Sequence, residues 1–180
     1  MKVVISGSPG SGKTSVINAL REKGHHCYDE VSRSVIQWGE EQGYKNYFLE
    51  APVAFSEKIW TARMEQYNQA TQQQHLHRYS FLDRGLHDSV AYLHYLNQQH
   101  DSWEAQLQQH TYDKVFLLPP WEAIYTKDQQ RLEDFTTAKA LYPHLSTIYK
   151  KYHAAVWEVP ADNVQARVEF ILQTLENEQS

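Results

Sequence analysis

Glycine, lysine and threonine occur near the start of the chain at a spacing that suits phosphate binding. Residues 7–14 match the pattern G-x-x-x-x-G-K-[ST] in full. Glycines let successive backbone N–H groups turn toward a phosphate, and the positive end of a following helix strengthens the attraction. We expect Lys13 to reach the β- and γ-phosphates of ATP and the Thr14 hydroxyl to join the shell of a Mg²⁺ ion. The alternative is a glycine-rich turn without a ligand. The predicted nucleotide-binding residues are Gly7, Ser8, Pro9, Gly10, Ser11, Gly12, Lys13, Thr14 and Ser15.

An acidic and a basic residue follow an apolar stretch further along the chain. Asp83 comes directly after Phe81-Leu82 and precedes Arg84. A phosphate-loop enzyme needs a carboxylate near its Mg²⁺ ion at the end of a neighbouring strand, and Asp83 is the best candidate. Arg84 is a candidate for contact with phosphate oxygens. Two other roles stay open, because Asp83 could cap a helix that begins near residue 86 and Arg84 could be a surface residue.

A pair of acids, Asp29 and Glu30, follows the short stretch 26–28. Glu30 could lie across the same sheet edge from Lys13, where it would accept a proton from a substrate hydroxyl or bind Mg²⁺ through water. Asp29 is the competing candidate, and a solvated acidic turn is the structural alternative. A salt bridge between Glu30 and Arg33, one helical turn further on, also stays open.

A polar, charged connection over residues 121–134 contains Arg131. A loop at this position can close over a nucleotide, and Arg131 could then meet the transferring phosphoryl group as an internal arginine finger. The alternative is an exposed helical turn in which Asp128 and Arg131 form an ion pair.

The elements that must position these residues alternate between strands and helices. Five short apolar stretches predict strands, and the longer segments between them have helix-like spacing. This alternation is typical of an α/β fold with a mostly parallel sheet and helices on both faces, here in a single domain over 1–180. Residues 43–51 are expected to be irregular. The predicted strands are 2–6, 26–28, 79–83, 114–118 and 154–159, and the predicted helices are 13–23, 31–42, 52–76, 86–98, 102–110, 135–152 and 163–176.

Composition and charge argue against several classes of protein. Hydrophobic residues make up 41% of the chain, which is enough for a buried core and is not typical of a disordered chain. The formal net charge of -5 makes nucleic acid an unexpected partner. The single cysteine, Cys27, excludes an intramolecular disulfide framework, and no apolar stretch is long enough to span a bilayer. We expect a cytoplasmic protein.

These motifs together resemble one group of proteins, and the resemblance covers nearly the whole chain. The group is the small, single-domain P-loop "AAA ATPase" proteins, which are similar to the ribosylnicotinamide kinase domain of the bacterial NAD regulator and, more distantly, to thymidylate and deoxynucleoside kinases. The stretches that carry the resemblance are the phosphate loop, Asp29 to Arg33, Phe81-Leu82-Asp83-Arg84-Gly85-x-x-Asp88, Tyr112 to Trp121, and Asp128-x-x-Arg131-x-Glu133-Asp134.

The resemblance implies a three-layer P-loop fold of the nucleoside or nucleotide kinase type with strand order 2-3-1-4-5. It also implies that the Asp83-Arg84 pair serves Mg²⁺ and phosphates, that Arg131 is a lid arginine, and that Glu30 is the catalytic acid. One departure concerns the acceptor. Deoxynucleoside kinases usually have proline after that acid, whereas Val31 follows it here, so their acceptor pocket cannot be carried over.

The residues and the resemblance favour a Mg²⁺-dependent small-molecule kinase that transfers the γ-phosphoryl group of ATP to a nucleoside-like or similar acceptor. The segment 44–76 is expected to form the acceptor side and 121–134 the lid. The alternative is an ATP-hydrolysing, nucleotide-dependent regulator that acts on a protein partner. The residues identify neither the acceptor nor the oligomeric state.

Overall fold

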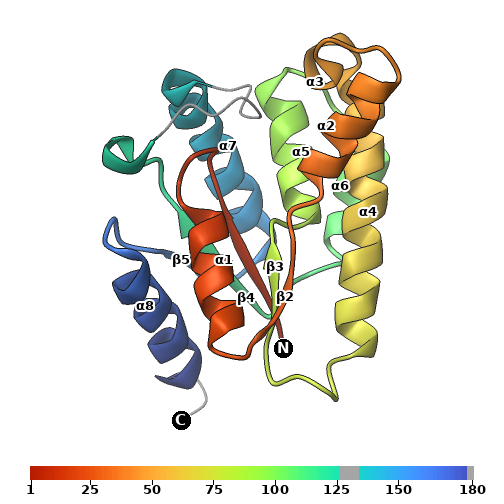
Figure 1. Cartoon of the computed structure of the whole chain (residues 1–180). Coiled ribbons are helices and arrows are strands. Elements are labelled where there is room, and N and C mark those ends of the chain that lie inside the picture. Colours follow the sequence, from red (N-terminus) through yellow and green to blue (C-terminus); the bar gives the residue numbers. More distant parts are fainter. Residues whose placement is uncertain (126–133, 178–180) are drawn as a thin grey trace.

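Five strands form one sheet in the computed structural model, which describes residues 1–125 and 134–177. The strands are β1 (Lys2–Gly7), β2 (His26–Tyr28), β3 (Ser80–Asp83), β4 (Lys114–Leu118) and β5 (Val156–Glu158). Their order is β2-β3-β1-β4-β5, and each pairing in this sheet is parallel (Figure 1). The predicted strand order and parallel sheet are confirmed. The carboxyl ends of the strands share one edge, where ligands bind in such sheets.

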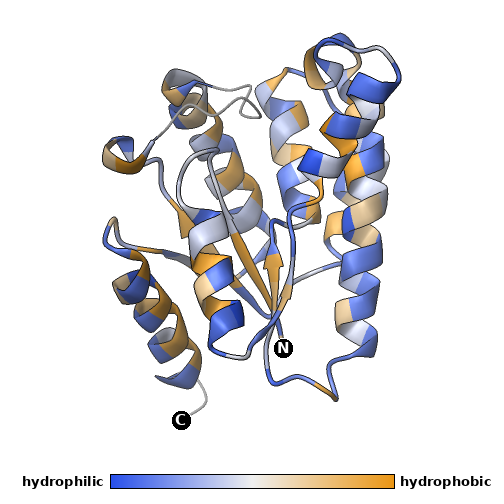
Figure 2. Ribbon diagram, in the orientation of Figure 1, coloured by the Kyte–Doolittle hydropathy of each residue, from blue (hydrophilic) through white to orange (hydrophobic). Residues whose placement is uncertain are grey.

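Both faces of the sheet are covered by helices, as predicted. Val3 and Ile5 of β1 pack in the cluster under α1 (Lys13–Glu22) and α8 (Val164–Asn177), whereas Val4 packs in the cluster on the opposite face. Successive strand residues point to opposite faces, so burial on both sides makes the central strands β1 and β4 largely apolar (Figure 2).

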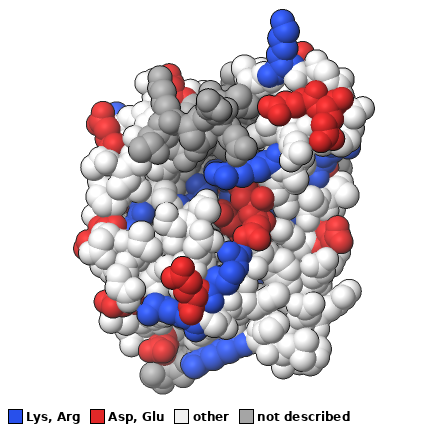
Figure 3. Space-filling model, in the orientation of Figure 1, with Lys and Arg blue, Asp and Glu red and all other residues white. Residues whose placement is uncertain are grey.

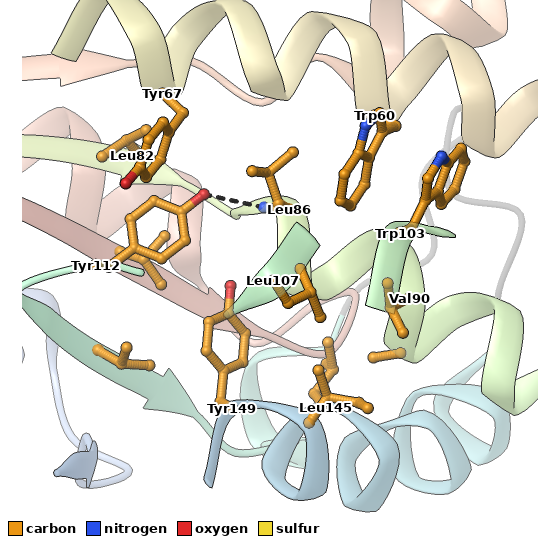
Figure 4. Packing of buried hydrophobic residues seen from close by; sticks show 14 of the residues in the cluster. Trp60, Tyr67, Leu82, Leu86, Val90, Trp103, Leu107, Tyr112, Leu145 and Tyr149 are labelled. Atoms are coloured by element: carbon orange, nitrogen blue, oxygen red, sulfur yellow. Dashed lines mark hydrogen bonds between the residues drawn. The ribbon is translucent and has the colours of Figure 1, made fainter. Parts of the chain in front are cut away.

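The opposite face carries the larger hydrophobic cluster. Its helices are α4 (Pro52–Gln72), α5 (Leu86–Tyr95), α6 (Asp101–Leu107) and α7 (Phe135–Tyr152). The indole rings of Trp60 and Trp103 stack with their centroids 4.7 Å apart and join α4 to α6 (Figure 4). The Tyr112 hydroxyl accepts a hydrogen bond from the Leu86 N–H at 3.0 Å and so fixes the start of α5. These contacts hold α5 firmly at the carboxyl edge of the sheet.

A third cluster lies beyond this edge. It joins α2 (Ser32–Glu41), α3 (Tyr47–Glu50) and the first half of α4. Its buried members are Val35, Tyr47, Phe48, Phe55 and Ile59. The helices α2 and α3 and the start of α4 lie together beyond the sheet edge, whereas the rest of α4 runs back alongside the sheet (Figure 1).

The segment 43–51, predicted to be irregular, contains the short helix α3. The Asn46 side chain accepts a hydrogen bond from the Leu49 N–H at 3.1 Å, and Glu50 accepts one from the Asn46 N–H at 2.7 Å. These two bonds satisfy backbone donors that a helix N-terminus otherwise leaves free. Side-chain capping therefore allows one helical turn where the sequence pattern shows none.

Several other boundaries also differ from the prediction, among them the ends of the helices predicted at 86–98 and 102–110, which lie at Tyr95 and Leu107. The helix predicted to end at residue 76 ends at Gln72, because the following residues are polar apart from Leu76, which is exposed. The last strand covers only 156–158. The connection after β4 begins with a short 3-10 helix, η1 (Glu122–Ile124). Among the described residues, no helix has the length and apolar character needed to cross a membrane.

Candidate active site

The predicted phosphate loop connects β1 to α1 at the carboxyl edge of the sheet. Gly7 ends β1 with φ 146°, and a Cβ at this position would lie 2.2 Å from the Leu118 carbonyl oxygen of β4. Gly12 precedes α1 with φ 86° in the left-handed region. These two positions require glycine, one for space and one for backbone conformation. The loop is further held by Ser8, whose hydroxyl donates to the Ala138 carbonyl oxygen of α7 at 2.6 Å.

Lys13 lies within this loop rather than out in solvent. Its ammonium group donates to the carbonyl oxygens of Gly7 and Ser8, both at 2.8 Å, and to the Ser11 hydroxyl at 3.3 Å. Burial lowers the pKa of Lys13, and the nearby Arg84 adds to this effect. Thr14 and Ser15 are exposed in the first turn of α1. The loop thus offers a cation and a hydroxyl to a ligand that binds above it.

Asp83 ends β3 beside Ile5 of β1, only 3% exposed. Its Oδ1 atom is buried without a hydrogen-bond partner among the described residues. Burial raises the pKa of this carboxyl to about 6, and the neighbouring Glu30 acts in the same direction. The alternative role as a helix cap is wrong, because Gly85 is the N-cap of α5. Asp83 is instead a buried carboxylate at the expected sheet edge.

Arg84 is buried, so the interpretation as a surface residue is wrong. Its guanidinium forms an ion pair with Glu30 and a second one with Asp88 at 2.9 Å. Its backbone has φ 72°, an uncommon conformation for a residue other than glycine, and its N–H donates to the Ile5 carbonyl oxygen at 3.0 Å. Such local strain persists only where surrounding contacts hold it, as these two ion pairs do.

Asp88 is the centre of a fully buried polar network. It accepts hydrogen bonds from the Ser6 and Tyr149 hydroxyls, both at 2.6 Å, and from the Gly85 N–H at 2.9 Å, besides its ion pair with Arg84. Burial would raise the pKa of Asp88, but Arg84, Arg63 and these hydrogen bonds lower it to about 2. The network connects β1, α5 and α7 behind the site and fixes the Arg84 side chain.

Of the two neighbouring acids, Glu30 faces the site and Asp29 does not. Asp29 is 80% exposed and pairs with Arg21 on the surface. Glu30 binds Arg63 at 3.1 Å and also pairs with Arg84. Burial would raise the pKa of Glu30, but the two arginines lower it below the ordinary value. Among the described residues, the ion-pair partners of Glu30 are these arginines and not Arg33, so that predicted alternative is wrong.

Arg63 is a site residue that the sequence interpretation missed. It lies on α4, is 4% exposed, and donates from Nη1 to the Ser89 hydroxyl and from Nη2 to Glu30, both at 3.1 Å. A signal was present, since Phe55, Ile59 and Arg63 follow one another at four-residue intervals on the buried face of α4. An arginine at a position where the helix is otherwise apolar indicates a buried polar partner.

Two cavities meet at the phosphate loop. One lies toward α2, α3 and α4 and is here called the acceptor-side cavity, because the segment 44–76 is expected to form the acceptor side. The other lies toward η1 and α8 and is called the donor-side cavity by the same expectation. Both are lined by Gly10, Lys13, Thr14 and Arg33. Basic and acidic side chains gather around the hollow on this side of the molecule (Figure 3). Charged groups are therefore concentrated where the two cavities join.

The lining of the two cavities differs in chemistry. The acceptor-side cavity includes Glu30, Ser32, Ile36, Phe48, Phe55, Ser56, Ile59, Arg63, Asp83, Arg84, Ser89 and Tyr92. The donor-side cavity includes Gly12, Ser15, Trp121, Ile124, Asp162, Asn163, Val164 and Arg167. The first combines aromatic rings with a carboxylate, and the second places an indole and a helix start beside the loop.

Arg131 and most of the predicted lid lie outside the described residues. Of the segment 121–134, the structure describes 121–125 and Asp134. The Asp134 side chain accepts a hydrogen bond from the Thr137 N–H at 2.7 Å and thereby caps the N-terminus of α7. The lid and its arginine stay predictions.

Comparison with solved structures shows the same fold in several kinases. Deoxyadenosine kinase from M. mycoides with bound dATP matches with a TM-score of 0.72 at 20% identity, over 98% of this chain and 99% of that one. Thymidylate kinase from Candida albicans matches with a TM-score of 0.64 at 14% identity, over 99% of this chain and 92% of that one. The NadR protein in complex with NR matches with a TM-score of 0.67 at 15% identity, over 98% of this chain and 50% of that one.

These likenesses confirm the predicted P-loop fold of the nucleoside and nucleotide kinase type. A comparison with curated proteins gives no significant match. A family model described as an AAA domain matches residues 2–167. Since this match includes the phosphate loop, all five strands and the start of α8, the chain belongs to the AAA domain family.

Proposed function

We propose that this protein is a Mg²⁺-dependent kinase that transfers the γ-phosphoryl group of ATP to a hydroxyl group of a nucleoside-like acceptor. The observation that carries the proposal is the pair of cavities that share Lys13, Thr14 and Arg33. A phosphoryl transfer enzyme must hold a donor and an acceptor on opposite sides of the transferred group. In this arrangement ATP occupies the donor-side cavity and the acceptor occupies the other.

The acceptor-side cavity suits a molecule with a flat ring and an uncharged hydroxyl. Phe48, Phe55 and Tyr92 supply aromatic surface for the ring. The buried arginines on this side, Arg63 and Arg84, are already neutralised by carboxylates. An acceptor phosphate would therefore compete with Glu30 and Asp88 for these cations. A hydroxyl acceptor needs no such exchange.

Glu30 is the group that would activate this hydroxyl. Its pKa is held low by Arg63 and Arg84 against the effect of burial, so it is ionised at neutral pH and can accept a proton. The two arginines also fix its orientation. Lys13 and Arg33 present positive charge at the junction of the cavities, where the transferred phosphoryl group carries its negative charge.

The residues at the junction also fit a Mg²⁺ ion. Oδ1 of Asp83 is buried without a hydrogen bond among the described residues, and burial together with the neighbouring Glu30 outweighs the nearby cations Lys13 and Arg84 and raises the pKa of this carboxyl. Thr14 is exposed in the same cavity. A carboxylate and a hydroxyl are ligands that Mg²⁺ accepts together with phosphate oxygens and water. When bound there, the ion would neutralise charge on the phosphates of ATP.

The solved structures with this fold suggest the classes of acceptor to test. Their names refer to deoxyadenosine kinase, thymidylate kinase and a protein in complex with NR. The alternative, an ATP-hydrolysing regulator of a protein partner, gives no role to a second cavity with a buried carboxylate and aromatic walls. The acceptor-side cavity is thus the feature that favours the kinase.

The deciding experiment measures ADP formation from ATP and Mg²⁺ with a panel of nucleosides, nucleoside monophosphates and ribosylnicotinamide, against a control without acceptor. We expect one nucleoside-like acceptor to stimulate ADP formation. Glu30→Gln should abolish this stimulation, whereas Asp29→Asn, the neighbouring surface acid, should leave it unchanged. Equal ADP formation with and without every acceptor would refute the kinase and leave an ATPase.

A further inference from the structure

A buried arginine on the last helix contacts the phosphate loop directly. Arg167 lies in the first turn of α8 and is 2% exposed. Its Nη1 donates to the Ser11 carbonyl oxygen at 2.9 Å, and its Nε donates to the Pro160 carbonyl oxygen at 3.1 Å. A Cβ on Gly12 would lie only 2.8 Å from Nη1. The guanidinium is therefore packed against the loop that is expected to hold phosphate.

The charge of Arg167 has no counter-ion in direct contact. Among the described residues, its guanidinium forms no ion pair, and its Nη2 atom is buried without a hydrogen-bond partner. Asp162 attracts it only from a longer distance, and burial lowers the pKa of Arg167. A guanidinium nevertheless stays protonated in proteins. A buried charge without a partner is unfavourable, so this arrangement destabilises the ligand-free protein.

The two buried arginines of the acceptor side provide a contrast. Arg63 and Arg84 both pair with carboxylates, whereas Arg167 lines the donor-side cavity without one. The Trp121 ring packs over the guanidinium of Arg167, with its centroid 5.4 Å from the Cζ atom. The donor-side cavity thus has Arg167 as a cation in addition to Lys13 and Arg33, against Asp162 as the single acid among its described lining residues, and an anion bound there would neutralise the excess positive charge.

We propose that Arg167 is a positioning residue of the donor site, which holds the phosphate loop through Ser11 and supplies positive charge that a bound triphosphate neutralises. The inference rests on the proposed binding of ATP in the donor-side cavity. It assigns to α8 a direct part in nucleotide binding. It also explains why the fold accepts a buried cation whose neighbours among the described residues are carbonyl oxygens and an indole.

The test compares three variants with the wild-type protein. Arg167→Gln removes the charge but keeps N–H donors, and Arg167→Lys keeps the charge but loses the planar fork. Lys150→Gln is the matched control, because Lys150 is an exposed cation near the end of α7. Calorimetry gives the dissociation constants of ATP and of inorganic tripolyphosphate. Thermal unfolding without ligand gives the midpoint temperature of unfolding, here called the midpoint.

We expect Arg167→Gln to weaken the binding of ATP and of tripolyphosphate by the same factor, about tenfold, because a positive charge beside the phosphate loop is lost. Its midpoint without ligand should equal or exceed that of the wild type, because an uncompensated charge is gone. Arg167→Lys should bind both ligands more tightly than Arg167→Gln does. Lys150→Gln should match the wild type in both measurements.

Three results would overturn the inference. They are unchanged ATP affinity in Arg167→Gln, weakened binding of ATP but not of tripolyphosphate, and a lower midpoint or failure to fold without ligand. The proposed kinase function is judged separately, since it depends on acceptor-stimulated ADP formation. A wild-type protein that binds ATP but responds to no acceptor would refute the kinase and leave the role of Arg167 intact.

Discussion

Replacement of Asp83 by asparagine tests two effects of this carboxylate separately. One is the loss of folding stability that its burial causes, and the other is its role at the proposed metal site. In the ligand-free protein the carboxyl has a pKa of about 6, against an ordinary value of 3.8. This difference corresponds to roughly 3 kcal/mol against the ionised form at neutral pH. Lys13 faces Asp83 and loses an attractive charge in the variant, so we expect a net gain in unfolding free energy of about 1–2 kcal/mol at pH 7.

The sign of the pH dependence follows from the raised pKa. The folded protein binds a proton at Asp83 more readily than the unfolded chain does, so this residue favours folding below pH 4 and the contribution is lost as the pH rises toward 6. Asp83→Asn should remove this loss. The unfolding free energy of the variant should therefore exceed that of the wild type by an amount that grows from pH 4 to pH 7. Urea unfolding at pH 4, 5, 6 and 7 without ligand measures this difference.

The same variant should lose Mg²⁺-dependent turnover by orders of magnitude while it keeps part of its ATP affinity, because the loop N–H groups remain. Calorimetry with ATP and an ADP assay at saturating Mg²⁺ measure the two effects. A ligand-free Asp83→Asn protein that is less stable than the wild type at pH 7 would refute the reasoning on burial. Unchanged turnover would refute the role of Asp83 at the metal.

Changes at four further residues test other parts of the site. Lys13→Ala should weaken triphosphate binding strongly in a protein that still folds, which calorimetry with ATP measures, and unchanged affinity would contradict the phosphate loop. Arg131→Ala should lower kcat more than it raises the dissociation constant of ATP. Arg131→Lys should restore little of the lost kcat, because the lysine ammonium lacks the planar, two-pronged guanidinium of arginine. Steady-state kinetics and equilibrium binding of ATP test both expectations. Asp88→Asn should cost about 2–3 kcal/mol of unfolding free energy, because the buried Arg84 keeps only Glu30 as a carboxylate partner and the hydrogen bonds to Asp88 lose their charge, whereas Tyr149→Phe removes one hydrogen bond and should cost about 1 kcal/mol. Urea unfolding compares these two variants, and equal losses would contradict the central role of Asp88.

Local patterns were sufficient to predict the parts of the site that follow directly from a strand. The phosphate loop after β1 and Asp83 at the end of β3 lie at the same sheet edge because parallel strands end there. The alternation of side chains also decides between the two acids. Tyr28 is buried at the end of β2, Asp29 is exposed and Glu30 turns inward, as a two-residue period predicts.

Residues that reach the site through helix packing could not be predicted in the same way. Arg63 meets Glu30 across 33 positions in sequence, and Arg167 meets Ser11 across 156. Such contacts depend on which helices cover which face of the sheet, and neither residue belongs to a local motif. The pairing of Arg84 with Asp88 could have been predicted from the sequence, because four-residue spacing at the start of a helix brings two side chains together.

The two cavities take their lining residues from different lengths of the chain. Every residue that lines the acceptor-side cavity lies between residues 9 and 92, whereas the donor-side cavity also needs residues 121, 124 and 162–167. A change that is confined to α8 therefore alters the lining of the donor-side cavity and leaves every lining residue of the acceptor-side cavity in place.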